Sequence, residues 1–332
     1  MSCEFPAAAQ AFCSQLGIRY PVIGGAMYPC SNPELTAAVS AAGGIGILQP
    51  ISLTYVHDHD YREGIRLMRR ITDKPIGMNA LIEKSSRKYH QRMSQWVEIA
   101  LEEGVRFFVT SLGKPDWVAE RVHAAGGLVY HDVTELKWAR IGLDNGADGL
   151  ICVNNRAGGH AGPRSMRELY DELHDLDVPL VCAGGVGDAA GLRDALACGY
   201  AACQLGTRFI ASRECRASDA YKQAVVDAGE ADIVLSERVT GIPVSVINTD
   251  FIKRGGTRMG WFSRWMLSGR RTKHWMRVFY GLKSIWQLKR SSLDETGAND
   301  YWQAGKSVAA IDSIESCDTI MKRLVNPEVE DT

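Results

Sequence analysis

Short runs of apolar residues recur along the chain, and each is followed by a longer segment whose apolar residues return with a helical period. The short runs predict buried strands and the longer segments predict amphipathic helices, so the pattern indicates repeated strand-helix units. We expect eight strands, at residues 22–25, 46–48, 76–80, 107–110, 128–131, 149–153, 180–183 and 202–205.

Eight strand-helix units at this spacing predict a closed parallel sheet, the (β/α)8 or TIM barrel. Local chemistry supports the helix assignments, since the helix expected at 32–42 opens with Asn32 and Pro33 and is followed by a glycine pair. The alternative is an open, doubly wound sheet, which would have its glycine-rich phosphate motif after the first strand. The glycine motifs of this chain follow the last strands instead, which favours the barrel.

The domain boundaries follow from where the alternation stops. It is lost after Arg208, and one further helix is expected at 313–324. We therefore predict a barrel domain formed by residues 1–211 and 306–332. Residues 212–305 are expected to form a mainly helical insertion after strand eight, which acts as a lid over the active-site face.

Composition restricts the classes of protein to consider. A chain of 332 residues, 45% of them hydrophobic and 23% charged, suits one barrel with an insertion. The formal net charge of -1 provides no overall attraction to nucleic acid. Nine cysteines without a CxxC pair favour reduced thiols, and neither a signal peptide nor a long apolar stretch is visible. We therefore expect a cytoplasmic protein.

Two glycine motifs follow neighbouring strands late in the chain. They contain Ala183, Gly184 and Gly185 after the seventh strand and Gln204, Gly206 and Thr207 after the eighth. Glycines at such turns expose backbone amides to an anion, and in barrels the loops after strands seven and eight often bind phosphate. The motifs therefore predict a phosphate site, against the alternative of two ordinary glycine turns.

A glycine-rich polar loop, residues 154–163, follows the sixth strand and contains His160. Catalytic residues of barrels lie at this end of the strands, and a histidine there can remove a proton or hydrogen-bond to a substrate anion. His160 is therefore the candidate catalytic residue. The alternative is a loop histidine that binds the backbone.

The ends of the first and third strands suggest a place for a flat ring. Gly25, Ala26 and Met27 end the first strand without a bulky group near the backbone, and Asn79 at the end of the third could hydrogen-bond the ring. Both features are also common in ordinary loops, so ring contact and loop structure remain open for each.

Other histidines and aspartates bear on the pocket and on metal binding. His131 and Asp132 end the fifth strand and are expected to line the substrate pocket. His57 and His59 alternate with aspartates, which could suggest a metal site. We interpret that segment as a solvated face, because its ligand set has no second element, and we predict no bound metal.

Six segments together resemble the nitronate monooxygenase family, over about residues 20–213. They are PVIGGAM at 21–27, AAGGIG at 41–46, GMN at 77–79, AGGHAG at 157–162, AGGV at 183–186 and GTRF at 206–209. The resemblance implies a barrel that binds FMN non-covalently. The motifs after strands seven and eight would hold its phosphate, and Ala26, Met27, Asn79 and Gln204 would lie near the rest of the flavin.

The resemblance also implies an activity. Members oxidise alkyl nitronates with O2 to a carbonyl compound and nitrite, and His160 would bind the nitronate or deprotonate the nitroalkane. The same motifs are similar to flavin-dependent enoyl-acyl carrier protein reductases and NAD(P)H:quinone reductases. An NAD(P)H-dependent reductase of an enoyl thioester or a quinone is therefore the alternative, and a flavin-free barrel that binds a phosphorylated metabolite is a third.

Two features distinguish this chain from many relatives. Arg156 stands where they have an acidic residue, and we expect it in the substrate pocket, where it would favour an anionic substrate or reduced flavin. Asp132 stands where some have a lysine.

The second part of the predicted lid is unusual in composition. Residues 251–293 contain no acidic residue, and basic and aromatic residues interleave along them. An amphipathic helical lid is the favoured interpretation. The alternatives are docking of an acidic acyl carrier protein and contact with an anionic membrane surface.

Overall fold

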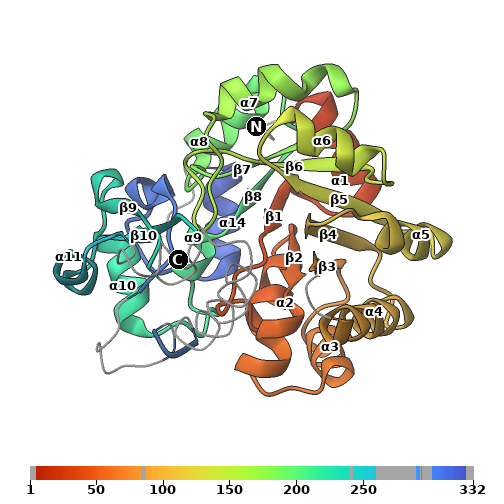
Figure 1. Ribbon diagram of the computed structural model, residues 1–332, viewed down its shortest axis with the longest axis horizontal. Helices are drawn as coiled ribbons and strands as arrows, with labels where there is room; N and C mark the ends of the chain where they lie inside the picture. The colour runs from red at the N-terminus through yellow and green to blue at the C-terminus, as the bar shows by residue number, and fades with distance from the viewer. Residues whose placement is uncertain are drawn as a thin grey trace, which may run out of the picture.

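The computed structural model describes residues 5–83, 87–238, 242–258, 289–291, 293 and 301–326. Eight parallel strands form a closed barrel, in which β1 pairs with both β2 and β8 (Figure 1). The predicted TIM barrel is therefore confirmed. The strands are β1 Val22–Gly24, β2 Ile45–Leu48, β3 Ile76–Ile82, β4 Phe107–Leu112, β5 Leu128–Val133, β6 Gly149–Val153, β7 Leu180–Ala183 and β8 Ala202–Leu205.

Helices surround the barrel and bury the outward faces of its strands (Figure 1). Phe12 and Leu16 of the first helix belong to the interior cluster, and Phe12 packs edge-on against Tyr130 at 5.9 Å between ring centroids. The helices are α1 Ala7–Leu16, α2 Pro33–Ala41, α3 Tyr61–Ile71, α4 Arg87–Glu102, α5 Asp116–Ala124, α6 Leu136–Leu143, α7 Met166–Leu173, α8 Ala189–Cys198 and α14 Cys317–Val325. Short turns η1 Ser52–Val56 and η2 His174–Leu176 follow β2 and α7.

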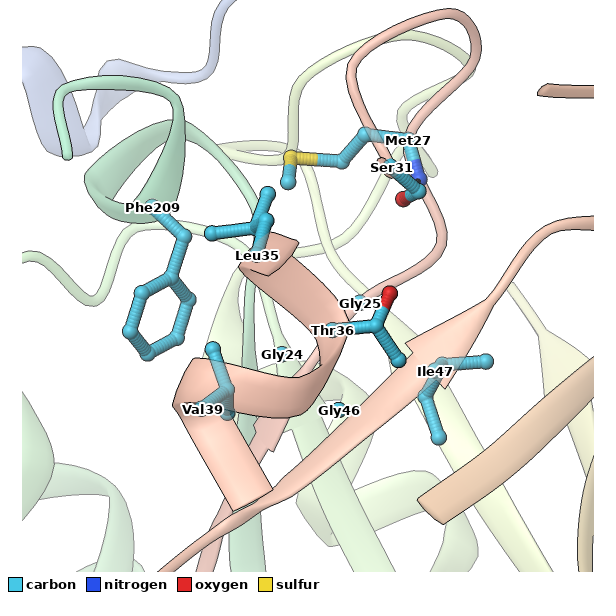
Figure 2. A pocket seen from close by; sticks show the side chains of 10 residues that line it. All are labelled: Gly24, Gly25, Met27, Ser31, Leu35, Thr36, Val39, Gly46, Ile47 and Phe209. Atoms are coloured by element: carbon cyan, nitrogen blue, oxygen red, sulfur yellow. Dashed lines mark hydrogen bonds between the residues drawn. The ribbon is translucent and has the colours of Figure 1, made fainter. Parts of the chain in front are cut away.

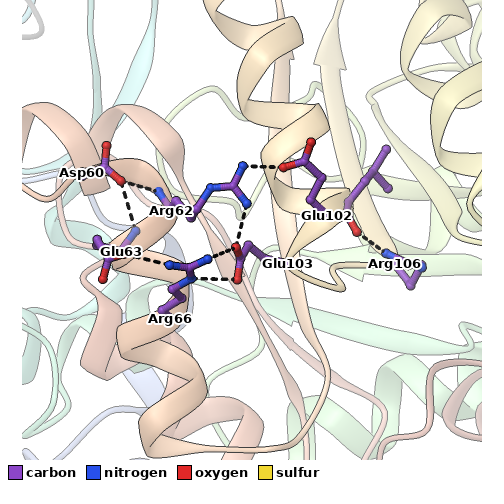
Figure 3. Close-up of polar contacts among 8 residues, drawn as sticks. Asp60, Arg62, Glu63, Arg66, Glu102, Glu103 and Arg106 are labelled. Atoms are coloured by element: carbon purple, nitrogen blue, oxygen red, sulfur yellow. Dashed lines mark hydrogen bonds and ion pairs between the residues drawn. The ribbon is translucent and has the colours of Figure 1, made fainter.

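Charged side chains join α3 to α4 on the outer surface of the barrel (Figure 3). Glu103, directly after α4, binds Arg62 Nη1 at 2.7 Å and Arg66 Nη2 at 3.0 Å. Arg62 also pairs with Glu102, and Arg66 pairs with Glu63. Hydrogen bonds from Arg62 and then Arg66 lower the pKa of Glu103. Because these groups are largely solvent-exposed, the network contributes little per pair and is weakened by salt.

The chain after β8 leaves the barrel and then returns to it. Its elements are α9 Thr207–Ile210, α10 Asp219–Asp227, η3 Glu230–Asp232, β9 Ile233–Ser236, β10 Val244–Ile247, α11 Asp250–Gly255 and η4 Lys306–Ala310. The antiparallel pair β9 and β10 was not predicted, although residues 244–247 are buried and three of the four are apolar. The hairpin, α10 and α11 gather at one side of the barrel (Figure 1).

Most of the basic and aromatic segment 251–293 lies outside the described residues. The predictions made for it, a helical lid or the docking of an acyl carrier protein or a membrane surface, therefore also fall outside them. Of the part that is described, Lys289 Nζ donates a hydrogen bond to the carbonyl of Tyr55 at 2.6 Å. That contact places one basic residue of the segment beside η1. No helix within the described ranges is long and apolar enough to cross a membrane.

A buried ion pair attaches the C-terminal segment to the barrel. Arg208 Nη2 lies 2.6 Å from Glu315 Oε2, and both side chains are about 5% exposed or less. Arg323 of α14 lies 2.5 Å from the other carboxylate oxygen of Glu315. Helix α14 was expected at 313–324 but begins at Cys317, because Ser316 caps it by accepting from the Thr319 amide.

Substitution Glu315→Gln is expected to lower the free energy of unfolding by about 3–5 kcal/mol, because it leaves Arg208 buried without a counter-charge. Urea unfolding measures the loss. The matched control is Glu98→Gln, whose partner Arg121 is more than a third exposed, and there we expect less than about 1 kcal/mol. Equal effects for the two variants would contradict the assignment of Glu315 as the anchor.

Candidate active site

The interior side chains at the carboxyl ends of the strands form the floor of the barrel mouth. Ile23, Ile47, Val109, Tyr130, Ile151 and Val181 belong to the interior core. Because strand side chains alternate in direction, the positions two residues further on also face inward. These mouth positions are Gly25, Gln49, Ser111, Asp132, Val153 and Ala183, and Gln204 follows the interior residue Ala202 in the same way. Asn79 also faces inward, because its neighbours Met78 and Ala80 belong to the outer core.

Most of these mouth positions were predicted from the sequence to belong to the site, but Gln49, Ser111 and Val153 were not. Counting two residues onward from each buried interior residue would have found them. Gln49 Oε1 accepts a hydrogen bond from the Ser52 amide at 2.6 Å, so this side chain also fixes the start of η1.

Glycines after β7 and β8 form a cradle at the mouth. Gly184 and Gly185 have φ angles of 118° and 83°, a left-handed conformation that favours glycine. A Cβ on Gly184 would lie 2.5 Å from Asn154 Oδ1, and one on Gly206 would lie 3.3 Å from Met27 Sδ. Thr207 Oγ1 accepts from the Gly305 amide at 2.9 Å, which brings the returning chain to the edge of the cradle.

Asn154 ties the loop after β6 to this cradle. Its Nδ2 donates to the Gly184 carbonyl at 2.9 Å, and its Oδ1 accepts from the Arg156 amide at 2.8 Å. Asn154 is fully buried, and its own amide donates to the Ala183 carbonyl at 3.0 Å. The two neighbouring loops are thus held in one arrangement by a single amide side chain that the sequence analysis had passed over.

Arg156 lies against the cradle, and its guanidinium is already paired with a carboxylate. A Cβ on Gly185 would be 2.8 Å from Arg156 Nε, so the side chain lies over that glycine. Its two terminal nitrogens each bind one carboxylate oxygen of Glu230 at 2.8 Å, and Lys306 Nζ lies 3.4 Å from the same carboxylate. Arg156, and then Lys306, lower the pKa of Glu230. The expected pull of Arg156 on a substrate anion is therefore reduced by a partner 74 positions away.

His160 lies in the loop after β6, which the β9–β10 hairpin holds in place. The Ser245 amide of β10 donates to the Gly159 carbonyl at 2.7 Å, and the Gly162 amide donates to Asn154 at 3.2 Å. His160 is exposed to solvent, while the protein atoms around its ring desolvate it and lower its pKa below the ordinary value. The ring has no hydrogen bond to any described residue, so its nitrogens are available to a ligand.

The two candidates at the end of β5 face opposite ways. His131 packs against Gly142 of α6, and its Nδ1 lies 2.8 Å from Thr110 Oγ1. Burial lowers the pKa of His131 to about 4. Asp132 faces the barrel interior, its Oδ1 is buried without a hydrogen-bond partner, and desolvation raises its pKa to about 7. The structure thus brings Asp132 to the mouth and places His131 among the outer helices, contrary to the expectation for His131.

The end of β1 approaches β8 closely. The Gly25 amide donates to the Leu205 carbonyl at 2.9 Å, and a Cβ on Gly25 would lie 2.9 Å from Gln204 Cγ. Gln204 Oε1 is buried without a partner, although an amide oxygen normally accepts hydrogen bonds. Asn79 Nδ2 donates to the Val109 carbonyl at 3.3 Å and lies among the mouth residues.

A small cavity, of about 190 Å³ including its open part, lies behind the β1 loop (Figure 2). Met27 and Ser31 lie above it, Phe209 lies to one side, and the remaining lining comes from β1, β2 and α2. The Met27 amide donates to Ser31 Oγ at 2.8 Å, which fixes the loop over the cavity. The lining is mostly apolar and belongs to the packing of α2 against the barrel, so we assign no ligand to this cavity.

The histidines after η1 do not form a metal cluster. His57 Nε2 lies 3.2 Å from the Pro29 carbonyl, and burial lowers its pKa to about 4. Its side chain is therefore half-buried against the β1 loop, which corrects the expectation of a solvated face for His57. Within the described ranges, no three His, Cys, Asp or Glu side chains gather as metal ligands.

A closed eight-stranded parallel barrel with glycine turns at the carboxyl ends of β7 and β8 has the architecture of the (β/α)8 barrel enzymes. Comparison with family models makes the class specific, because residues 10–327 match the model described as nitronate monooxygenase. The chain belongs to the nitronate monooxygenase family. It is a flavin-dependent oxidoreductase with the fold that the motifs predicted.

Individual relatives differ in what their names state. The chain is 32% identical to (3aS,4S,5R,7aS)-5-hydroxy-7a-methyl-1-oxo-octahydro-1H-indene-4-carboxyl-CoA dehydrogenase of Rhodococcus jostii, over 71% of this chain and 65% of that protein. It is 26% identical to a probable nitronate monooxygenase of Staphylococcus saprophyticus, over 72% and 78%. Among solved structures, FabK from Thermotoga maritima is 26% identical to this chain and superposes with a TM-score of 0.77. The match covers 95% of this chain and 94% of the FabK chain.

Proposed function

We propose that the cradle binds the phosphate of FMN, and the observation that carries the proposal is the pair of left-handed glycines beside a second glycine turn. The positive φ angles of Gly184 and Gly185 turn the chain sharply after β7, and the lack of a side chain at Gly184, Gly185 and Gly206 leaves their backbone amides open to close approach by an anion. Thr207 adds a hydroxyl at the same edge. Ala183, which belongs to the interior core, ends β7 directly before the turn.

The ring of FMN would lie across the mouth. Gly25, Ala26 and Met27 would pass beneath it without bulky groups, and Asn79 would contact it from β3. The unpartnered Gln204 Oε1 is consistent with a flavin at this position. The flavin ring carries an N–H donor that could satisfy this buried acceptor. When bound, FMN supplies an acceptor for electrons from the substrate and can pass them to O2.

For the substrate we propose an alkyl nitronate or its parent nitroalkane, in keeping with the family. His160 would act on the substrate side of the mouth, because it is exposed in the loop after β6 and its ring makes no hydrogen bond to the described chain. Its lowered pKa keeps the imidazole neutral near pH 7, so it can accept a proton from the acidic carbon of a nitroalkane. In the same position it can hydrogen-bond a nitronate oxygen through its remaining N–H.

A CoA thioester is a second candidate substrate, favoured by the name of the 32% identical relative. A thioester also has an acidic carbon next to its carbonyl, so His160 could perform the same proton transfer. The segment 212–305 would then act as a lid that helps to select the substrate. In the opposite, reductive direction, NAD(P)H would reduce the flavin and an enoyl thioester would accept the two electrons.

Anaerobic mixing of the FMN-loaded protein with ethylnitronate, a saturated acyl-CoA, NADH and NADPH separates these proposals. Flavin bleaching by ethylnitronate, followed by oxygen uptake when air is admitted, is the expected result for the first candidate. Bleaching by acyl-CoA or NAD(P)H with no response to ethylnitronate would replace it by the second. A purified protein that neither contains nor takes up FMN would overturn the cofactor assignment.

A further inference from the structure

Asp132 is a carboxyl group at the mouth that the proposed reaction has not used. It faces inward two residues after the core residue Tyr130, and Ile151 of β6 is its partner in the sheet register. Oδ1 is buried without a partner, and no hydrogen bond to either oxygen occurs in the described part of the chain. The surrounding mouth residues Ser111 and Val153 carry no charge.

Burial without a partner is costly for a carboxylate, so a purely structural aspartate would be expected to have one. The structure supplies partners elsewhere: Asp188 caps α8 through the Gly191 amide at 2.8 Å, and the buried Glu315 pairs with Arg208 at 2.6 Å. Asp132 has no such role in the fold. Its orientation toward the mouth therefore suggests that its partner is a ligand.

The ionisable groups nearest the mouth do not neutralise Asp132. The guanidinium of Arg156 is engaged by Glu230, and Arg164, in the loop after β6, pairs with Glu172 at 2.5 Å and Glu135 at 4.0 Å. The ring of His160 is desolvated, and His131 on the same strand faces the outer helices, where burial keeps it neutral. Cys152 on β6 is buried in the outer core. Desolvation alone therefore sets the pKa of Asp132, which it raises to about 7.

We propose that Asp132, as a neutral carboxylic acid, donates a hydrogen bond to the flavin ring and controls how readily the flavin accepts electrons. The inference rests on the proposed binding of FMN. Gln204 on β8 and Asp132 on β5 both turn unpartnered polar atoms toward the mouth, one as an acceptor and the other as a donor. A flavin ring has both an N–H and several acceptor atoms, so one ligand can satisfy both residues.

The physical consequence is a pH-dependent reduction potential. The neutral acid stabilises the negative charge that the flavin gains on reduction, whereas the carboxylate repels it in a poorly solvated site. The reduction potential should therefore fall more steeply as pH rises through the pKa of Asp132, near 7. A reduced, negatively charged flavin should in turn raise that pKa further.

The test is the midpoint potential of the FMN-loaded protein, measured spectroelectrochemically from about pH 5.5 to pH 8.5, a range that spans the raised pKa. The wild type should show an extra bend near pH 7. Asp132→Asn has the same shape but cannot ionise, so the bend should disappear while FMN stays bound. The matched control is Asp144→Asn at the exposed end of α6, which should leave the bend unchanged.

The outcomes distinguish the two proposals. If wild type and Asp132→Asn bind FMN and their potentials depend identically on pH, the role of Asp132 is wrong and the FMN site stands. If the wild type does not bind FMN, both proposals fail.

A second measurement uses the wild-type chain alone. The ¹³C chemical shift of the Asp132 carboxyl carbon should titrate near pH 7 and shift to higher pH when reduced FMN is bound. An ordinary aspartate titration, near the usual pKa of about 3.9, would overturn the proposal even if the asparagine variant does not fold.

Discussion

Substitution Gly206→Val is expected to weaken FMN binding strongly while the barrel still folds. Gly206 has a φ of -111°, so a side chain causes no left-handed strain there. Its Cβ would point toward Met27 Sδ at 3.3 Å, and the two further carbons of valine would extend into the cradle proposed for the phosphate. Loss of about two charge-assisted hydrogen bonds, each worth about 1.5–3 kcal/mol, weakens binding by about 100-fold or more.

Titration of the apoprotein with FMN, followed by flavin fluorescence, measures this effect. Gly191→Ala is the matched control, since it changes a nearby glycine within α8. Its Cβ would have neighbours at 3.4 to 3.6 Å, an ordinary contact distance, and alanine favours the helix by up to about 1 kcal/mol. The control should bind FMN like the wild type. Wild-type affinity in Gly206→Val would place the phosphate elsewhere.

The barrel could be predicted because its strands are buried on both faces and therefore appear as short apolar runs. The predicted ends differ from the observed strands by three residues or fewer. The β9–β10 hairpin was missed for a related reason. β9 is only partly buried, with Leu235 59% exposed, and four-residue strands give a weak periodic signal.

The candidate site was predictable only in part. Strand ends converge at one end of a barrel, so the positions of Gly184, Gly206 and His160 follow from strand order alone. Side-chain direction does not, and for that reason His131 and Asp132 were assigned to the same pocket although they face opposite sides of β5. Partners distant in sequence are also invisible to motif spacing, as the pairing of Arg156 with Glu230 illustrates.

The pairing of Arg156 with Glu230 changes how charge acts in the proposed mechanism. An isolated arginine beside the cradle would attract an anionic substrate strongly, whereas Arg156 is held by Glu230, a carboxylate that it shares with Lys306. Hydrogen bonding from His160 would then add to a weakened attraction by this cluster in holding a nitronate. The expected contribution of His160 to turnover is correspondingly large.

Substitution His160→Ala is expected to lower kcat/KM for nitroalkane by about 100- to 10,000-fold, the range for loss of a positioned acid or base. The ring has no hydrogen bond within the described chain and the residue is exposed, so removal of the ring should change the free energy of unfolding by less than about 0.5 kcal/mol. FMN should therefore stay bound. His123→Gln, which changes an exposed histidine paired with Asp148, is the control and should retain full activity.

The pH dependence tests the role of His160 more directly. Desolvation lowers the pKa of His160, so the neutral base is present above that pKa and is lost as the pH falls through it. For the wild type, kcat/KM for nitroethane should accordingly decline on the acid side at a pH below the ordinary histidine pKa of about 6.5. His160→Gln should lack this acid limb, yet it should oxidise preformed ethylnitronate better than nitroethane, because the nitronate has already lost its proton. An unchanged acid limb in His160→Gln would assign the base to another residue, and Asp132 would be the first to examine.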